Sequence, residues 1–331
     1  MKTQHVAVSI ALACACAANA AAEQAWPSKP ITWIVPFPAG GATDVLSRAA
    51  AERLGAALNV QVVVENVPGA SGAVGLERLK RAAPDGYTVA TSPNSMQAVL
   101  PYLASSPLPF NTLKDFTPLA GISSFQYVFD VQANSPYQTL NDLIRRAREA
   151  PETISMGTTG VGSGSHLGGI LLAHMTGVKF NDVRYKGGAP ALTDLMGGHI
   201  DFVVDPVGGS LGHIGAGKLR ALAASGAKRI GQLPDVPLVA ETVPGYEHMG
   251  WFGLYGPANL PPHIVQAFSE AMSRVQKDPK FLEALDQLAY EPMPADPQEL
   301  DARQRAEFDN WGKVLSEAGL IEGPSKLSQS N

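Results

Sequence analysis

Two glycine-rich segments carry the residues whose types and spacing indicate chemistry. The first, Pro36-Phe37-Pro38-Ala39-Gly40-Gly41-Ala42-Thr43-Asp44, leaves an apolar run and enters an amphipathic one. Glycines let the backbone approach a ligand closely, and the unpaired N–H groups and dipole of a first helical turn favour an anion. The segment lacks both nucleotide patterns, G-x-x-x-x-G-K-[ST] and G-x-G-x-x-G. It predicts either an anion-binding loop or a tight turn in which Thr43 or Asp44 caps the helix.

The second segment is Gly157-Thr158-Thr159-Gly160-Val161-Gly162-Ser163-Gly164-Ser165-His166. Its hydroxyls and free amides would form a neutral pocket, rich in donors, that a carboxylate occupies without a salt bridge. A nucleophilic serine is an alternative, with Ser163 or Ser165 activated by His166. The segment does not match the G-x-S-x-G elbow that such a serine usually needs, and a purely structural turn is the third interpretation.

Smaller features add candidates. Asp205 follows the apolar run Phe202-Val203-Val204, where its carboxylate would accept a bond from a ligand amine or hydroxyl, or else cap the next turn. Tyr185 precedes the turn Lys186-Gly187-Gly188, and Ala70-Ser71 lies in a short loop like the first segment. The histidines show no metal-binding spacing, so we expect neither a metal nor a cofactor.

The elements that must position these residues alternate along the chain. Short apolar runs and amphipathic stretches follow one another from Pro30, a pattern typical of βαβ units and a parallel sheet. The pattern predicts strands at 31–35, 61–65, 87–91, 127–131, 154–157, 183–185, 201–204 and 219–224. It predicts helices at 44–58, 72–82, 140–149, 165–175, 189–196, 262–275, 279–288 and 297–318. The two glycine segments would then each link a strand to a helix, in two α/β lobes that share a cleft.

The amino-terminal residues have another purpose. Lys2 is followed by an apolar run, Val6 to Cys16, and by small residues around Ala20-Ala21-Ala22, as in a cleaved secretory signal peptide. We therefore expect residues 1–22 to be removed and the protein to be exported from the cytoplasm. Both cysteines, Cys14 and Cys16, lie in this segment; lipid attachment at one of them is the alternative. Because the net charge is −5, with no basic stripe, nucleic acid is excluded as a partner.

Several motifs in order resemble one family. They are Pro36 to Asp44, Glu65 to Gly72, Gly160 to Leu167, Tyr185 to Ala191, Asp194 to Asp201, Leu222 to Arg229 and Leu233 to Pro237 with Glu241. Together they resemble the Bug family of extracytoplasmic solute receptors, also called tripartite tricarboxylate transporter receptors. The chain departs from the family pattern at Val67 and Ala73, which puts polar contacts from the second helix in doubt. It also departs at Gly164, which would make the second loop more flexible.

The resemblance implies a periplasmic-binding-protein fold of two doubly wound α/β lobes, joined by two crossings, with a ligand cleft between them. We expect residues 23–123 and 226–331 to form lobe 1 and residues 124–225 to form lobe 2. The implied function is non-catalytic capture of a small carboxylated metabolite (a dicarboxylate, tricarboxylate, acidic amino acid or aromatic acid) and its delivery to a membrane transporter. The receptor would act as a monomer.

The implied ligand-binding residues come from both lobes. They are Phe37, Ala39, Gly40, Gly41, Thr43, Asp44, Ala70 and Ser71 from lobe 1, and Thr158, Gly162, Ser163, Gly164, Ser165, His166, Tyr185 and Asp205 from lobe 2. Two alternatives remain open. One is a secreted serine hydrolase that uses Ser163 or Ser165 with His166, and the other is a ligand sensor that partners a membrane receptor kinase.

Overall fold

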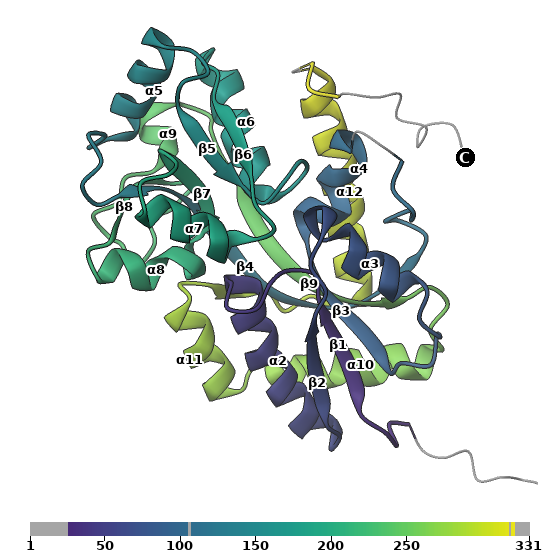
Figure 1. Cartoon of the computed structure of the whole chain (residues 1–331). Helices are drawn as coiled ribbons and strands as arrows, with labels where there is room; N and C mark the ends of the chain where they lie inside the picture. The colour runs from purple at the N-terminus through teal and green to yellow at the C-terminus, as the bar shows by residue number, and fades with distance from the viewer. Residues whose placement is uncertain (1–25, 105–106, 318, 322–331) are drawn as a thin grey trace, which may run out of the picture.

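The protein consists of two α/β lobes, as the sequence predicts (Figure 1). We describe it from a computed structural model that covers residues 26–104, 107–317 and 319–321. The predicted signal peptide, with Cys14 and Cys16, lies outside the described residues. Within the described ranges, no helix is long and apolar enough to cross a membrane.

The strands belong to one continuous curled sheet. Its order is β2-β1-β3-β9-β4-β7-β5-β6, and both β8 and β10 pair with β4. The strands are β1 Ile31–Val35, β2 Val62–Asn66, β3 Thr88–Pro93, β4 Phe116–Gln132, β5 Ser155–Thr158, β6 Asn181–Arg184, β7 Phe202–Pro206, β8 Leu219–Ala224, β9 Met249–Pro257 and β10 Glu291–Pro292.

Helices cover this sheet in both lobes. Those of the first lobe are α2 Ala42–Leu58, η1 Ala70–Gly72, α3 Ala73–Lys80, η2 Ser95–Val99, α4 Leu100–Leu103, α10 Pro262–Val275, α11 Pro279–Gln287 and α12 Pro297–Glu317. Those of the second lobe are α5 Leu140–Glu149, α6 Gly164–Thr176, α7 Gly188–Met196 and α8 Val207–Gly215. A short helix, α9 Val239–Thr242, lies in the segment between β8 and β9 and packs against α5. In Figure 1 the two groups lie on opposite sides of the point where β4 passes between the lobes.

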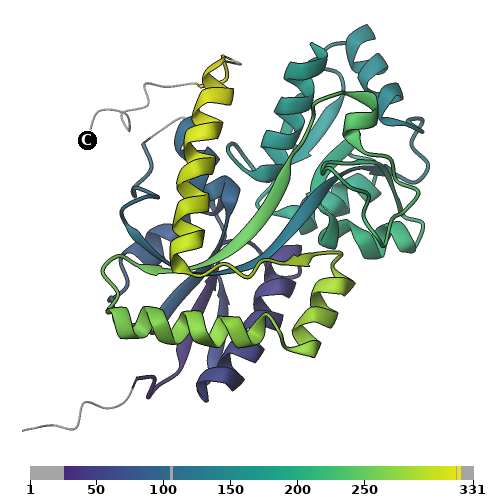
Figure 2. The same ribbon diagram turned by 180° about the vertical axis from the view of Figure 1, so that it is seen from behind.

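The long strand β4 joins the lobes. Its first part, Phe116 to Gln126, pairs with β9, and its last part, Tyr127 to Gln132, pairs with β7 and β8. Figure 2 shows β4 and β9 side by side at the centre of the molecule. These pairs are antiparallel, as is β3 with β9, whereas the outer strands of each lobe are parallel as predicted. The chain returns from lobe 2 through the segment between β8 and β9. The boundaries at residues 123/124 and 225/226 stay a prediction.

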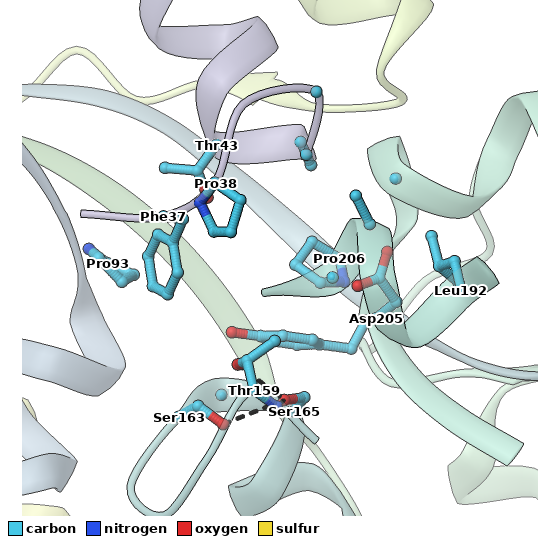
Figure 3. Close-up of a pocket in the computed structure, with 18 of the residues that line it drawn as sticks. Phe37, Pro38, Thr43, Pro93, Thr159, Ser163, Ser165, Leu192, Asp205 and Pro206 are labelled. Atoms are coloured by element: carbon cyan, nitrogen blue, oxygen red, sulfur yellow. Dashed lines mark hydrogen bonds between the residues drawn. The ribbon is translucent and has the colours of Figure 1, made fainter. Parts of the chain in front are cut away.

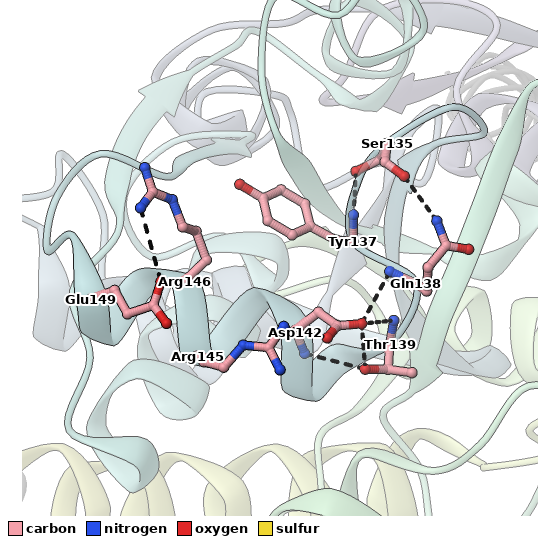
Figure 4. Close-up of polar contacts among 8 residues, drawn as sticks. All are labelled: Ser135, Tyr137, Gln138, Thr139, Asp142, Arg145, Arg146 and Glu149. Atoms are coloured by element: carbon pink, nitrogen blue, oxygen red, sulfur yellow. Dashed lines mark hydrogen bonds and ion pairs between the residues drawn. The ribbon is translucent and has the colours of Figure 1, made fainter.

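A local signal explains where α5 begins. In α5, the Thr139 side chain accepts a bond from the Asp142 amide while the Asp142 carboxylate accepts one from the Thr139 amide, which is a capping box (Figure 4). Arg145, one turn along, pairs with the same carboxylate at 2.9 Å. These contacts satisfy amides that the first helical turn cannot pair internally.

The core is apolar and continuous between the two lobes. One cluster of buried side chains extends from Trp33 on β1 and Leu46 on α2 to Phe129 on β4 and Phe202 on β7. A second cluster packs Leu167 of α6 against Val99 and Leu103 near α4, and against Leu315 of α12. Because these residues come from both lobes, burial of apolar surface holds the lobes together in this conformation.

Candidate functional site

A cavity of about 210 Å³ lies between the two lobes. It is lined by Phe37, Pro38, Gly40, Gly41, Ala42, Thr43, Pro93, Ser95, Phe125, Tyr127, Thr159, Ser163, Gly164, Ser165, Gly188, Ala189, Leu192, Thr193, Met196, Asp205, Pro206, Gly209, His213 and Phe252. Figure 3 shows the first-lobe residues Phe37, Pro38 and Thr43 facing the second-lobe residues Asp205 and Leu192 across this space. The site is therefore built by segments far apart in the sequence.

The amino end of α2 forms one wall of the cavity. Gly41 caps the helix without a side-chain bond, so the first-turn amides of Ala42 and Thr43 have no partner within the helix. Gly40 has a positive φ of 83°, a conformation in which glycine meets no steric penalty. Its amide donates to Oδ2 of Asp44 at 3.0 Å, which fixes the loop. The amides available to a ligand are thus those of Ala42 and Thr43 rather than that of Gly40.

The amino end of α6 forms the opposite wall. Ser163 caps this helix by accepting a bond from the His166 amide at 3.2 Å, which leaves the amides of Gly164 and Ser165 at the first turn. Ser165 Oγ accepts a bond from the Thr159 amide at 2.9 Å and lies 3.0 Å from Ser163 Oγ (Figure 3). The hydroxyls therefore form a connected polar edge beside the free amides.

Two further helices contribute their amino ends. Gly188 and Ala189 begin α7, and Pro206 and Gly209 lie at the start of α8. Asp205, the residue before Pro206, is 2% exposed and lines the cavity. Burial raises the pKa of Asp205 to about 7, and a bond from the Ser210 hydroxyl at 3.4 Å opposes the shift in part.

Aromatic side chains form the remaining surface. Phe125 and Tyr127 on β4, together with Phe252 on β9, line the cavity from the strands that join the lobes. The Tyr127 ring stacks on His248 at 4.4 Å between centroids, and His248 Nε2 lies 2.9 Å from the Gly164 carbonyl oxygen. Burial lowers the pKa of His248 to about 4, so this imidazole is neutral at neutral pH. It supports the aromatic surface rather than supplying a charge.

The cavity suits an anion because, in the part of the chain that the structure describes, helix amino ends and not basic side chains face it. Among the described lining residues there is no lysine or arginine, and the ionisable side chains are Asp205, His213 and Tyr127. The positive ends of the α2 and α6 dipoles and their free amides are directed at the same space from opposite lobes. The arrangement can hold a carboxylate through main-chain donors.

Comparisons with known proteins identify the family. A family model described as the tripartite tricarboxylate transporter family receptor matches residues 46–320, most of the chain. The chain belongs to this receptor family. It is thus a periplasmic solute-binding receptor of the Bug type, and the resemblance inferred from its motifs is confirmed.

Three solved structures are similar to this receptor. One is the periplasmic binding protein BugD, with 31% identity, a TM-score of 0.85, and coverage of 89% of this chain and 99% of that chain. Another is Rpa4515 of R. palustris with adipate, with 32% identity, a TM-score of 0.85, and coverage of 89% and 98%. The third is MatC from Rhodopseudomonas palustris with bound malate, with 27% identity, a TM-score of 0.84, and coverage of 88% and 100%. They confirm the predicted fold class.

The receptor's cavity brings together half of the residues predicted from sequence. Those that line it are Phe37, Gly40, Gly41, Thr43, Ser163, Gly164, Ser165 and Asp205. Those that lie outside its lining are Ala39, Asp44, Ala70, Ser71, Thr158, Gly162, His166 and Tyr185. The prediction that each contacts a ligand remains a prediction.

Three residues outside the lining bond to neighbouring side chains instead. Asp44 accepts bonds from Asn66 at 2.8 Å and from Arg48 at 3.1 Å. Burial opposes ionisation of this carboxyl, yet these bonds outweigh it and lower the pKa of Asp44. The hydroxyl of Thr158 donates to Asp182, and that of Tyr185 donates to Asp194. Each side chain therefore stabilises a loop of the site from behind.

Other residues outside the lining lie where the two lobes meet. A Cβ added at Gly160 would come 2.4 Å from Ser71 Oγ, and one added at Gly162 would come 2.6 Å from Leu100 Cδ1. The second glycine segment thus touches the η1 loop and α4 of the first lobe. Ser71 and Gly162 contribute to this contact between lobes rather than to the cavity wall.

Half of the lining residues that sequence reasoning missed are aromatic or on α7. Phe125, Tyr127 and Phe252 have no local signal for ligand contact, because they lie in strands that read as ordinary core. Leu192 and Met196 lie on the apolar face of α7, where the same ambiguity applies. Gly188 could have been predicted from the sequence, since it lies between a predicted strand and a predicted helix.

Proposed function

We propose that this receptor binds a small organic carboxylate in the cavity between its lobes. The observation that carries the proposal is the pair of helix amino ends with free first-turn amides: Ala42 and Thr43 offer amides from one lobe, and Gly164 and Ser165 from the other. Exclusion of water between the lobes lowers the local dielectric and strengthens these bonds. An anion that touches both lobes favours the closed state because it binds that state more tightly.

The ligand class follows from the two kinds of surface in the cavity. The amides suit a carboxylate, and the walls of Phe37, Phe125 and Phe252 suit the hydrocarbon part of the same molecule. The adipate and malate bound by similar receptors have this composition. We propose a dicarboxylate, tricarboxylate, acidic amino acid or aromatic acid as the ligand, with no covalent step.

We further propose that the receptor acts in the periplasm after removal of residues 1–22 and as a monomer. It would present its closed, loaded form to the membrane subunits of a tripartite tricarboxylate-type transporter. The family supports this proposal. Uptake of the bound acid by cells with and without the receptor gene tests it, and equal uptake in both would contradict delivery to a transporter.

A thermal-shift screen of carboxylic acids tests the binding proposal. The wild-type receptor, freed of copurified ligand, should be stabilised by at least one acid at millimolar concentration. The variant Ala42→Glu places a carboxylate beside the α2 amides and should abolish this stabilisation. The matched variant Ala42→Gln adds nearly the same bulk without the charge and should lose less.

Two results would contradict the binding proposal. One is a folded wild-type receptor that no acid stabilises. The other is an Ala42→Glu variant that binds as the wild type does, which would place the anion elsewhere. The double variant Ser163→Ala with Ser165→Ala tests the hydrolase alternative, because an enzyme would lose turnover of an ester substrate whereas a receptor has none to lose.

A further inference from the structure

Asp205 has an unused hydrogen-bonding position that faces the cavity. Its carboxyl group is directed toward the space between the lobes, opposite Phe37 and Pro38 (Figure 3). The Ser210 hydroxyl donates to Oδ2 at 3.4 Å, a long bond. Among the described residues, no side chain or amide donates a hydrogen bond to Oδ1. This oxygen is not among the buried unpartnered atoms, so a molecule in the cavity can reach it and donate a hydrogen bond to it.

The backbone closes around Asp205 on two sides. A Cβ added at Gly188, the first residue of α7, would come 2.6 Å from Oδ1, and one added at Gly209 of α8 would come 2.2 Å from Oδ2. The carboxyl group thus lies between the amino ends of two helices, where an anion is favoured. The protein itself supplies the negative group there. A ligand carboxylate is therefore directed to α2 and α6, whose first turns present no acidic side chain to the cavity.

The surroundings of Asp205 supply little positive charge. Asp130 and Tyr127 face it from β4, Tyr290 from the segment before β10, and His213 of α8 lines the same cavity. The side chain of Asp130 points to the same face of the sheet, because Val128 pairs with Asp205 and lies two residues away. Both Asp130 oxygens are buried without a hydrogen-bond partner. Because burial raises the pKa of Asp130 well above its usual value, that carboxyl stays neutral, and Asp205 is the group here whose charge a cation would neutralise.

Building on the proposed carboxylate site, we propose that Asp205 selects ligands that carry an ammonium group as well as a carboxylate. The ligand class is then the amino acids, above all the amino dicarboxylates, rather than unsubstituted dicarboxylates. An ammonium group supplies both the donor that Oδ1 lacks and the counter-charge that the region lacks. A hydroxyl group would supply only the donor, and a third carboxylate would be repelled.

Matched ligand pairs test this proposal by calorimetric titration at pH 7.5. The pairs are succinate with aspartate, glutarate with glutamate, and adipate with 2-aminoadipate, in which only the amino group differs. We compare dissociation constants within the pair whose carbon-chain length gives the tightest binding. In that pair the amino ligand should bind the wild type about tenfold more tightly or better, as expected for a hydrogen bond to a charged group. In Asp205→Asn the ratio of the dissociation constant of the unsubstituted acid to that of its amino counterpart should fall to about three or less.

The control variant is Asp194→Asn, on the same helix as Gly188 but with a carboxylate that accepts a bond from Tyr185. Asp194→Asn should keep the wild-type ratio of the two dissociation constants. The proposal is overturned if the unsubstituted dicarboxylate binds the wild type as tightly as its amino counterpart, a result that needs no variant and leaves the carboxylate site itself intact. Absence of binding by all six acids, together with a negative thermal-shift screen, would instead remove the carboxylate site.

The pH dependence supplies an independent readout. Burial raises the pKa of Asp205 to about 7 in the empty cavity. An ammonium ligand requires the ionised form, so its affinity should rise with pH up to about 7 and level off above it. An unsubstituted dicarboxylate prefers the protonated form, so its affinity should stay level up to about pH 7 and fall above it. Identical pH profiles for the two ligands in the wild type would also overturn the proposal.

Discussion

Replacing Gly187 with alanine should weaken ligand binding without disturbing either lobe. Gly187 precedes α7 in the second lobe and faces Pro38, in the loop between β1 and α2 of the first. Its φ of 174° and ψ of 174° are extended, so alanine meets no backbone penalty. An added Cβ would lie 2.6 Å from Pro38 Cδ and 3.0 Å from Cγ, inside the optimal carbon contact of about 3.5–4.0 Å.

The magnitude follows from how the clash is relieved. The lobes must separate by roughly 1 Å at this point to restore a normal contact, which the closed state resists and the open state does not. Overpacking of this kind costs about 1–3 kcal/mol. Because the cost arises when the lobes close on the ligand, it should appear as a dissociation constant raised by about 5-fold to 150-fold. The unfolding transition of the ligand-free protein should not change.

Calorimetric titration with the tightest-binding acid measures this effect. The control is Gly215→Ala, at the end of α8, where an added Cβ would have no atom within 4 Å. It should bind within twofold of the wild type. Wild-type affinity in Gly187→Ala would refute the inference that Gly187 and Pro38 touch in the loaded state. An equal loss in both variants would show that any glycine replacement weakens binding.

Three other substitutions probe stability. Asp205→Asn should raise the free energy of unfolding of the ligand-free protein at pH 8 and have less effect at pH 4.5. Because folding raises the pKa of Asp205 from 3.8 to about 7, the wild type loses stability as the pH rises between these values, and the loss is complete above 7; urea denaturation at both pH values checks this. Thr139→Ala removes the cap of α5 and should lower the free energy of unfolding by about 0.5–2 kcal/mol, with unchanged ligand affinity. Glu307→Ala leaves the Trp251 indole N–H without its acceptor and should cost about 1–3 kcal/mol in thermal or urea denaturation, whereas Glu307→Gln retains an acceptor and should cost less.

Elements with strong local signals were predictable to the residue. The helix Leu140–Glu149 has the predicted bounds, because Thr139 and Asp142 form a capping box at its start. The strand Ile31–Val35 also has the predicted bounds, since an apolar run there ends at a proline. In both cases the information that sets the bounds lies within a few residues.

Elements that depend on tertiary packing were predicted less well. The sequence indicated only 127–131 of β4, because its first half, Phe116 to Gln126, owes its extended form to pairing with β9 more than a hundred residues later. The helix Val207–Gly215 was not predicted, and only the residues directly after Asp205 were interpreted as a turn, since glycines have low helix propensity. Its contacts with β4, β7 and β8 outweigh that propensity.

The candidate site shows the same division. The two glycine segments were recognisable because a helix start and its free amides are local features. The aromatic wall of Phe125, Tyr127 and Phe252 was not, because it requires the pairing of β4 with β9. The position of Asp44 behind the loop was also hidden, since its partner Asn66 is 22 residues away, at the end of β2.

The crystal structure of the receptor with the acid that binds most tightly tests the central claim most directly. We expect one carboxylate within about 3 Å of the main-chain nitrogens of Ala42 or Thr43 in one lobe and of Gly164 or Ser165 in the other, as hydrogen bonds from amides require. A carboxylate bound outside the cavity, or held by lysine or arginine side chains while these amides contact only water, would contradict the claim.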